Sequence, residues 1–250
     1  MLFLLEAVCK KGFISKIERE ERAVGGVRAA ILRLCVARRG GRRRIEKLLD
    51  GMASAICAQA EGRAVYREDF PFCRELAERG VCEAGERELY KAKAVEILSS
   101  AAERKERLFV AFDKSDAGLS DTLRKSAARF RYIEAEAPPD ELYSLRQMLM
   151  RDGVSLCSSR PGSSKADAAL IFSQPKNPRY FKESCAVLAL RSDRGHFGGH
   201  RVVSVEFTFP DGFHESVPDG YPLAPIAAYA LSVGALDPHG ICAARVKTEK

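Results

Sequence analysis

The sequence predicts an α/β protein with a mostly parallel sheet in its C-terminal half and an α-rich N-terminal half. The stretch from Arg107 to Arg129 is typical of a buried strand that feeds a helix, because an apolar run stops at Asp113 and a helical repeat begins at Leu119. After this stretch, strand and helix patterns alternate. Such alternation is typical of parallel strands joined by right-handed crossovers.

The second half of the chain supplies most of this alternation. Strand patterns occupy residues 108–112, 132–135, 154–157, 168–172 and 186–190, and helical patterns occupy 119–130 and 140–151. Residues 202–209 alternate apolar with polar side chains, as an antiparallel or edge strand does, and a helix over 224–233 and a strand over 241–246 follow. This order, over about residues 107–250, resembles that of Rossmann-like domains, so we expect a Rossmann-like α/β domain over residues 105–250.

Residues 1–104 are expected to form an α-rich region with one or two short strands. A strand over 2–8 leads into a mixed-charge connector or hairpin over 16–22. The repeat of Val27, Ile31 and Leu34 then predicts a helix over residues 24–40. The remaining patterns predict a helix over 45–56, a strand over 63–67, and helices over 72–80 and 85–104.

Composition and charge narrow the class of protein. With 250 residues, of which 46% are hydrophobic, the chain can bury a substantial core, and no apolar run reaches the roughly 18–20 residues that cross a bilayer. The eight cysteines are scattered without a C-x-x-C pair, which favours free thiols in a reducing compartment over disulfides or a metal site. We therefore expect a cytoplasmic protein without metal or membrane association, and the net charge of +7 favours anionic partners.

Candidate ligand-binding residues follow from the predicted sheet. Ligands of open parallel sheets bind outside the carboxyl ends of the strands, near the point where the strand order reverses. The polar residues around these predicted ends are Asp113, Lys114 and Ser115 near the first strand, Glu134 near the second, and Ser158, Ser159 and Arg160 near the third. Their carboxylates, hydroxyls and cations predict a small anionic ligand at this edge.

The loop after the first strand argues against a standard nucleotide site. It has one glycine, Gly118, so the NAD fingerprint and the P-loop are both absent. Lys114 and Asp116 also bring side chains to the place where backbone would approach a phosphate. Glu134, however, occupies the position of an acidic residue that holds a ribose.

Two interpretations of this edge therefore stay open. It is either a degenerate nucleotide-type rim on a non-catalytic protein, or the site of a nucleotide- or phosphate-dependent transferase or reductase. The candidate residues of such an enzyme are Asp113, Ser115, Glu134 and Arg160.

The other polar loops do not define a catalytic site. The serine-rich stretch 158–165 fits either an anion-binding loop or a plain flexible loop. His196 and His200 lie four residues apart, but the glycines around them disfavour a helix, so a mobile hairpin loop is a better interpretation than a metal pair. No catalytic residue is assigned.

A basic run marks the expected helix turn at residues 38–47. It contains Arg38, Arg39, Arg42, Arg43, Arg44 and Lys47. Such a cluster attracts phosphates, as in a nucleic-acid-binding surface. The alternative, a solvated turn whose arginines complement the C-terminal dipole of the preceding helix, is favoured because no aromatic residue is interleaved to stack on bases.

Three functional hypotheses follow. The leading one is a non-catalytic binding, scaffold or regulatory protein that takes a small anionic ligand or a protein partner. The second is the nucleotide- or phosphate-dependent enzyme, and the third is a nucleic-acid-associated protein. The sequence names no cofactor and no oligomeric state.

Overall fold

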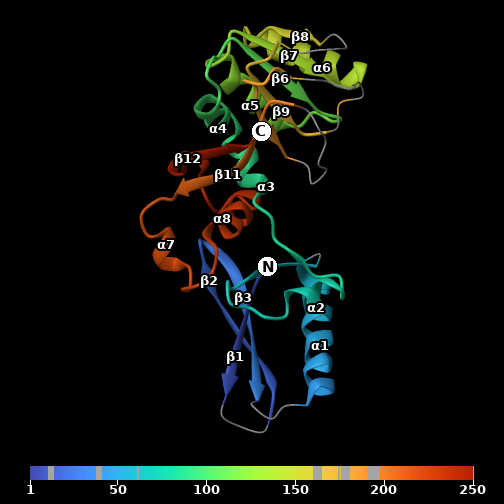
Figure 1. Ribbon diagram of the computed structural model, residues 1–250, viewed down its shortest axis with the longest axis vertical. Helices are drawn as coiled ribbons and strands as arrows, with labels where there is room; N and C mark the ends of the chain where they lie inside the picture. The colour runs from blue at the N-terminus through green and yellow to red at the C-terminus, as the bar shows by residue number, and fades with distance from the viewer. Residues whose placement is uncertain are drawn as a thin grey trace. The chain divides into compact units, whose positions relative to one another are not determined.

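The computed structural model describes residues 1–10, 14–37, 41–60, 62–159, 165–173, 175, 181–190 and 198–249. The chain divides into two compact units, unit 1 (Met1–Leu89 and Phe209–Gly240) and unit 2 (Tyr90–Thr208 and Ile241–Lys250). Each unit contains parallel strands, so the protein is a mixed α/β protein, as the sequence predicts (Figure 1). The predicted domains, 1–104 and 105–250, are continuous in the chain whereas the units are not. Whether those domains fold separately stays a prediction.

Unit 1 is built on a five-stranded sheet with the order β2-β3-β1-β4-β5. Its elements are β1 (Leu2–Lys10), β2 (Lys16–Val24), β3 (Val27–Ala37), α1 (Arg42–Ala60), β4 (Arg63–Tyr66), α2 (Cys73–Ala77), β5 (Cys82–Glu83), the start of α3 (Arg87–Ala92), α7 (Phe213–Ser216), α8 (Leu223–Ser232) and the 3-10 turn η1 (Pro238–Gly240). β1 pairs in parallel with β3 and β4, and β2 pairs antiparallel with β3.

The helix predicted over residues 24–40 is wrong, because Val27–Ala37 forms β3. The apolar repeat fits both structures, since neighbouring residues from Ala29 to Leu32 are all buried and a strand buried on both faces shows no alternation. The distinguishing signal is the Gly25–Gly26 pair, whose φ angles of 57° and 80° are those of a two-residue hairpin turn. The N-terminal half therefore contains a five-stranded sheet beside its helices, where only one or two short strands were predicted.

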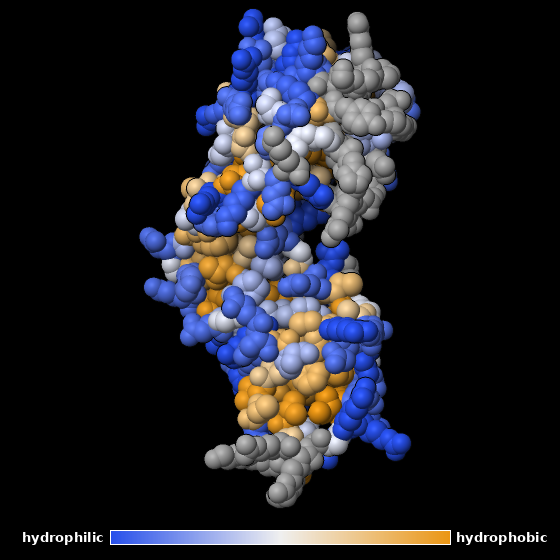
Figure 2. Space-filling model, viewed as in Figure 1, coloured by the Kyte–Doolittle hydropathy of each residue, from blue (hydrophilic) through white to orange (hydrophobic). Residues whose placement is uncertain are grey.

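The core of unit 1 lies between α1 and one face of the sheet. Leu5 and Leu32 of the strands pack in one cluster with Met52 and Ile56 of α1. Hydrophobic residues are also visible at the surface in the region of β1, β3 and α1 (Figure 2). Leu48 of α1 is one of the partly buried hydrophobic residues that pack against the core cluster. On the opposite side of the strands, the segment 209–240 completes the unit. For example, the backbone nitrogen of Glu68 donates to the Gly220 carbonyl oxygen at 2.9 Å.

Unit 2 contains a seven-stranded sheet with the order β12-β11-β10-β9-β6-β7-β8. Its elements are the second half of α3, then α4 (Ala94–Ala101), β6 (Arg107–Ala111), α5 (Ala117–Ala127), β7 (Tyr132–Glu136), α6 (Pro139–Arg151), β8 (Leu156–Ser158), β9 (Ala168–Ile171), β10 (Ala186–Ala189), β11 (His200–Thr208) and β12 (Cys242–Glu249).

The strand order of unit 2 is Rossmann-like. From β6 the chain moves outward to β7 and β8, and it returns on the other side of β6 with β9, β10 and β11. All neighbouring pairs from β8 to β11 are parallel, and the order reverses between β6 and β9. The strand predicted over 202–209 as antiparallel or edge is β11, and its antiparallel pairing is confirmed. β11 pairs antiparallel with the edge strand β12 from Arg201 to Thr208, and it pairs in parallel with β10 only at His200 and Arg201.

Helices α4, α5 and α6 pack on one face of this sheet. Val110 of β6 shares a cluster with Ile97, Leu123 and Leu145 of the three helices, while Phe109 packs on the other face in a cluster with Phe181. The single helix predicted over 85–104 is in fact α3 and α4, separated at Lys93, whose φ and ψ angles of −107° and 10° interrupt the helix. Among the helices of the described residues, none has the length and apolar character needed to cross a bilayer.

Candidate functional sites

The rim at the carboxyl ends of β6, β7 and β9, here called the switch-point rim, was the predicted ligand site. It contains a cavity of about 10 Å³, lined by Phe112, Asp113, Glu136, Ala137, Pro138, Ser173 and Pro175. This volume is near the lower limit for a single water molecule. This cavity between the described residues at the ends of β6, β7 and β9 is therefore too small for a nucleotide.

The start of α5 is occupied by the chain's own carboxylate. Asp116 is the N-cap residue, and its side chain accepts a hydrogen bond from the Leu119 backbone nitrogen at 2.6 Å. Lys91 lies 2.8 Å from the same carboxylate. Burial by itself would raise the pKa of Asp116, but the hydrogen bonds from Lys91 and Leu119 outweigh it and lower the pKa. The helix end that binds phosphate in nucleotide folds thus already holds a negative charge.

The other predicted residues near β6 and β7 are also engaged. The Ser115 hydroxyl and backbone nitrogen both donate to Glu141, at 2.5 and 2.9 Å, and these bonds lower the Glu141 pKa. Glu134 lies within β7 and pairs with Arg107 at 3.1 Å. Glu136, and not Glu134, is the last residue of β7. Asp113 and Lys114 are exposed in the loop after β6.

The predicted serines lie on a separate strand. Ser158 ends β8 and accepts a hydrogen bond from Arg146 at 2.9 Å. The Ser159 hydroxyl is buried and has no partner among the described residues. β7 separates these serines from the loop after β6. Arg160 and His196 lie outside the described residues, and His200 begins β11.

The basic run has a different setting from the one predicted. Arg38 and Arg39 lie outside the described residues, whereas Arg42, Arg43 and Arg44 form the first turn of α1, which has no acidic residue there. The predicted pairing with the C-terminal dipole of a preceding helix is wrong, because the element before the run is the strand β3. The positive end of the α1 dipole instead adds to the arginine charges.

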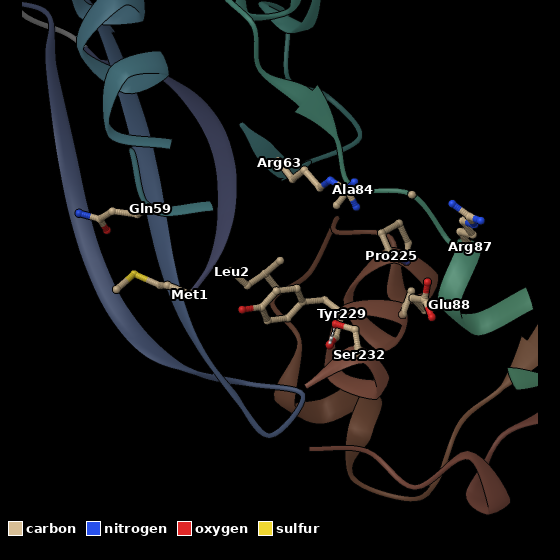
Figure 3. Close-up of a pocket in the computed structure, with 12 residues that line it drawn as sticks. Met1, Leu2, Gln59, Arg63, Ala84, Arg87, Glu88, Pro225, Tyr229 and Ser232 are labelled. Atoms are coloured by element: carbon tan, nitrogen blue, oxygen red, sulfur yellow. Dashed lines mark hydrogen bonds between the residues drawn. The ribbon is translucent and has the colours of Figure 1, made fainter. Parts of the chain in front are cut away.

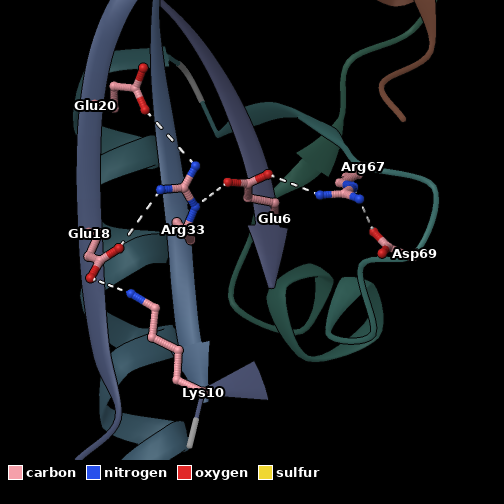
Figure 4. Close-up of polar contacts among 7 residues, drawn as sticks. All are labelled: Glu6, Lys10, Glu18, Glu20, Arg33, Arg67 and Asp69. Atoms are coloured by element: carbon pink, nitrogen blue, oxygen red, sulfur yellow. Dashed lines mark hydrogen bonds and ion pairs between the residues drawn. The ribbon is translucent and has the colours of Figure 1, made fainter. Parts of the chain in front are cut away.

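A polar cluster surrounds the nearly buried Glu6 on the sheet of unit 1 (Figure 4). Glu6 lies between Arg33, with which it pairs closely, and Arg67, whose NH1 is 3.3 Å from Glu6 Oε2. The hydroxyl of Tyr221 is buried without a hydrogen-bond partner among the described residues, and burial raises its pKa, with nearby Glu6 adding to this effect. The opposite charges are matched within this cluster, so its contacts stabilise the fold and leave little room for a ligand.

Unit 1 contains a much larger cavity, here called the α8 pocket, of about 430 Å³. It lies at the amino ends of β1 and β4, beside α8 (Figure 3). Its lining residues are Met1, Leu2, Gln59, Arg63, Ala84, Gly85, Arg87, Glu88, Pro225, Ala228, Tyr229 and Ser232.

The α8 pocket combines an apolar floor with a polar edge. Leu2, Ala84 and Ala228 are at most 8% exposed, and they line the cavity with the buried Pro225. In Figure 3, Arg63 reaches towards Ala84, Arg87 lies beside Glu88 at the start of α3, and Tyr229 projects from α8 towards Leu2. The Ser232 hydroxyl donates to the Tyr229 carbonyl oxygen of the same helix at 2.7 Å.

Sequence reasoning missed the α8 pocket for two reasons. Its residues come from four separate stretches of chain, the first two residues, residues 59–63, residues 84–88 and residues 225–232, and none of them forms a motif. The pocket also lies at the amino ends of parallel strands, whereas the rule for open sheets selects the carboxyl ends. The only local signal is the apolar helix α8, which is strongly buried for its length.

Within the described residues, no group of three or more His, Cys, Asp or Glu side chains is arranged to hold a metal ion.

Comparisons with known proteins give little beyond this geometry. No protein-family model matches the chain, and no curated protein sequence does so either. A solved structure of lysine cyclodeaminase, described for its recognition of L-lysine, L-ornithine and L-2,4-diaminobutyric acid, is 16% identical with a TM-score of 0.34. The match covers 60% of this chain and 51% of that one, so the chain spans about half the length of the cyclodeaminase. At this similarity the match assigns no residue and no activity to the chain.

Proposed function

We propose that the protein is a non-catalytic binding protein that holds a small molecule in the α8 pocket. The observation that carries this proposal is the volume of about 430 Å³ above an apolar floor. Pockets for small ligands usually measure about 300–1,000 Å³ and combine apolar walls with a few polar groups. The switch-point rim offers about 10 Å³ among the described residues, so it is the weaker candidate.

The lining of the α8 pocket supports binding over catalysis. Acid–base or nucleophilic catalysis needs a titratable group held against a second one. Among the described lining residues, Glu88 is the one carboxylate, and histidine and cysteine do not occur. The Ser232 hydroxyl is directed to its own helix, which leaves it without an activating base.

A ligand screen by thermal unfolding tests this proposal. A ligand at about 100 times its Kd adds roughly 2.7 kcal/mol to the stability of the state that binds it, which raises the Tm by several degrees. We expect Ser232→Phe, which fills the α8 pocket, to abolish the shift. Val233→Phe is the matched control, because Val233 is the next residue, is 54% exposed and does not line the pocket. Equal shifts in both variants would contradict the proposal.

The same screen distinguishes the enzyme hypothesis from the binding function proposed for the α8 pocket. ATP, NAD, NADP and S-adenosylmethionine are included as ligands for the switch-point rim. A saturable shift with one of them that persists in Ser232→Phe would favour the nucleotide- or phosphate-dependent enzyme.

A second candidate, nucleic-acid binding, is favoured by one observation. Arg42, Arg43 and Arg44 lie in the first turn of α1, where the helix dipole reinforces their charge. Binding through them should fall steeply between about 50 and 200 mM salt. We expect a triple change of these arginines to glutamine to abolish binding of labelled DNA or RNA, measured by fluorescence polarisation. Changing the exposed Arg28, Arg74 and Lys247 to glutamine is the charge-matched control, and equal losses in both variants would remove this candidate.

A further inference from the structure

The edge of the α8 pocket carries two arginines that form no ion pair within the described part of the chain. Arg63 is the first residue of β4 and Arg87 the first of α3. Neither forms an ion pair with any of the described residues, although other arginines of unit 1, such as Arg33, Arg67 and Arg79, are each paired with a carboxylate. The pocket edge therefore has cationic groups whose hydrogen-bond donors are free for a ligand.

Among the described lining residues of the α8 pocket, the charges leave a net positive balance. Glu88 is the one acidic residue among them, against two arginines. Figure 3 shows Glu88 beside Pro225, while Arg63 approaches Ala84. An anionic group near Ala84 would thus meet Arg63 before it met the Glu88 carboxylate.

The floor of the same cavity selects an apolar group. Leu2, Ala84 and Ala228 line this floor, and their side chains consist only of carbon and hydrogen. Burying apolar ligand surface here is favourable by about 25 cal/mol per Å². A fully hydrated small anion such as free phosphate gains nothing from this floor.

We propose that the ligand of the α8 pocket is an amphipathic anion, a carboxylate or a phosphate monoester attached to an apolar body, with the anion held by Arg63 and Arg87. This inference rests on the proposed binding function of the pocket and names its ligand class. Guanidinium groups suit both anions, because two N–H donors can bind two oxygens of either one.

Four probes with the same apolar body test the ligand class. Octanoate, octyl phosphate, octylamine and octanol are titrated into the full chain by isothermal calorimetry. We expect at least one of the two anions to bind about 10-fold or more tightly than octanol, as charge-assisted hydrogen bonds imply, and octylamine to bind most weakly. Octanol binding as tightly as both anions, or octylamine binding best, would overturn the inference.

Variants of the two arginines test the anionic ligand class separately from the binding function of the pocket. Arg63→Gln and Arg87→Gln should each weaken binding of the anion by about 5- to 10-fold and leave octanol unchanged. Arg74→Gln is the control, because Arg74 is 89% exposed and lies outside the pocket lining. If octanol and the anions bind alike and Ser232→Phe abolishes both, the binding function stands and the anion inference fails. If none of the four probes binds, both proposals fail.

The pH of the titration distinguishes the two anions. An aliphatic carboxylate loses its charge near the pH at which Glu does, about 4 to 5, whereas a phosphate monoester keeps one negative charge there. Octanoate binding should therefore weaken as the pH falls through this range, and octyl phosphate binding should persist. Octanoate binding that is unchanged through this range would contradict a charged carboxylate in the pocket.

Discussion

At the scale of single residues, Asp116 explains why the start of α5 is not open to a phosphate. Its carboxylate caps α5 through the Leu119 nitrogen and pairs with Lys91. A bound phosphate would need the same donors and would meet a negative charge. The sequence predicted a side chain at this place in the loop, whereas the capping role of Asp116 is seen in the structure.

The role of Asp116 predicts a pH-dependent stability. Folding lowers the pKa of the Asp116 carboxyl below its ordinary value of 3.8. The charged carboxylate therefore stabilises the folded state above pH 3.8, and this stabilisation is lost as the pH falls through the lowered pKa of the folded state. Asp116→Asn keeps a capping oxygen but loses the charge. Since the side chain is 58% exposed, we expect the free energy of unfolding to fall by about 0.5 kcal/mol at neutral pH. Urea unfolding at neutral pH and well below 3.8 checks this, and a deficit that does not shrink in acid would contradict it.

Glu6 predicts a larger effect on stability. Its side chain is 9% exposed and lies between two arginines, so Glu6→Gln removes the buried carboxylate from both cations and leaves them only their more exposed partners, Glu18 and Glu20 for Arg33 and Asp69 for Arg67. We expect a loss of about 2 kcal/mol in the free energy of unfolding. Glu20→Gln is the control, because Glu20 is 52% exposed and 4.0 Å from Arg33, and it should change stability by less than about 0.5 kcal/mol. Equal effects of the two changes would show that the Glu6 cluster is not a structural ion pair network.

At the scale of elements, the strands and helices of unit 2 were largely predictable and the sheet of unit 1 was not. The segments β6, α5, β7 and α6 each have a clear period and short connections. β3 lacks a period because it is buried on both faces, so only its hairpin turn identifies it. The position of the switch-point rim could be predicted because it follows from where the strands end. The α8 pocket could not be predicted, because it forms by packing of segments that are far apart in the sequence.

The hairpin between β2 and β3 predicts a strained substitution at Gly25. An added Cβ would lie 2.8 Å from Cε2 of Phe213, a ring that is 6% exposed, and the φ angle is positive. We expect Gly25→Ala to cost about 2–3 kcal/mol in the free energy of unfolding. Gly212→Ala shares the positive φ but meets nothing within 4 Å, so it should cost only about 1 kcal/mol. Chemical denaturation of both variants measures the difference, and equal costs would refute the close packing of Phe213.

At the scale of the whole molecule, the chain returns to unit 1 after building most of unit 2. Residues 209–240 supply α8, which carries part of the pocket lining. A sequence divided at residue 104 therefore separates α8 from the strands β1 and β4 that share its pocket. Composition and local periodicity do not indicate that residues 209–240 belong to unit 1, because both halves of the chain have ordinary globular composition.

This arrangement predicts which fragments fold. A fragment of residues 1–104 lacks the segment 209–240, so its sheet would expose apolar side chains, and we expect it to aggregate or stay unfolded. A chimera that joins residues 1–89 to 209–240 through a flexible linker of about 10 residues should fold cooperatively. Circular dichroism and thermal unfolding of the two chains check this. A well-folded 1–104 fragment would instead support the division predicted from the sequence.

The central claim is that a small ligand binds in the α8 pocket and not at the switch-point rim. Methyl NMR of protein labelled at alanine and leucine, during a titration with octanoate, tests it most directly. We predict saturable shifts of the Leu2, Ala84 and Ala228 methyl signals, with Ala137 at the rim unchanged. Shifts of Ala137 without shifts of Ala84 and Ala228 would contradict the account.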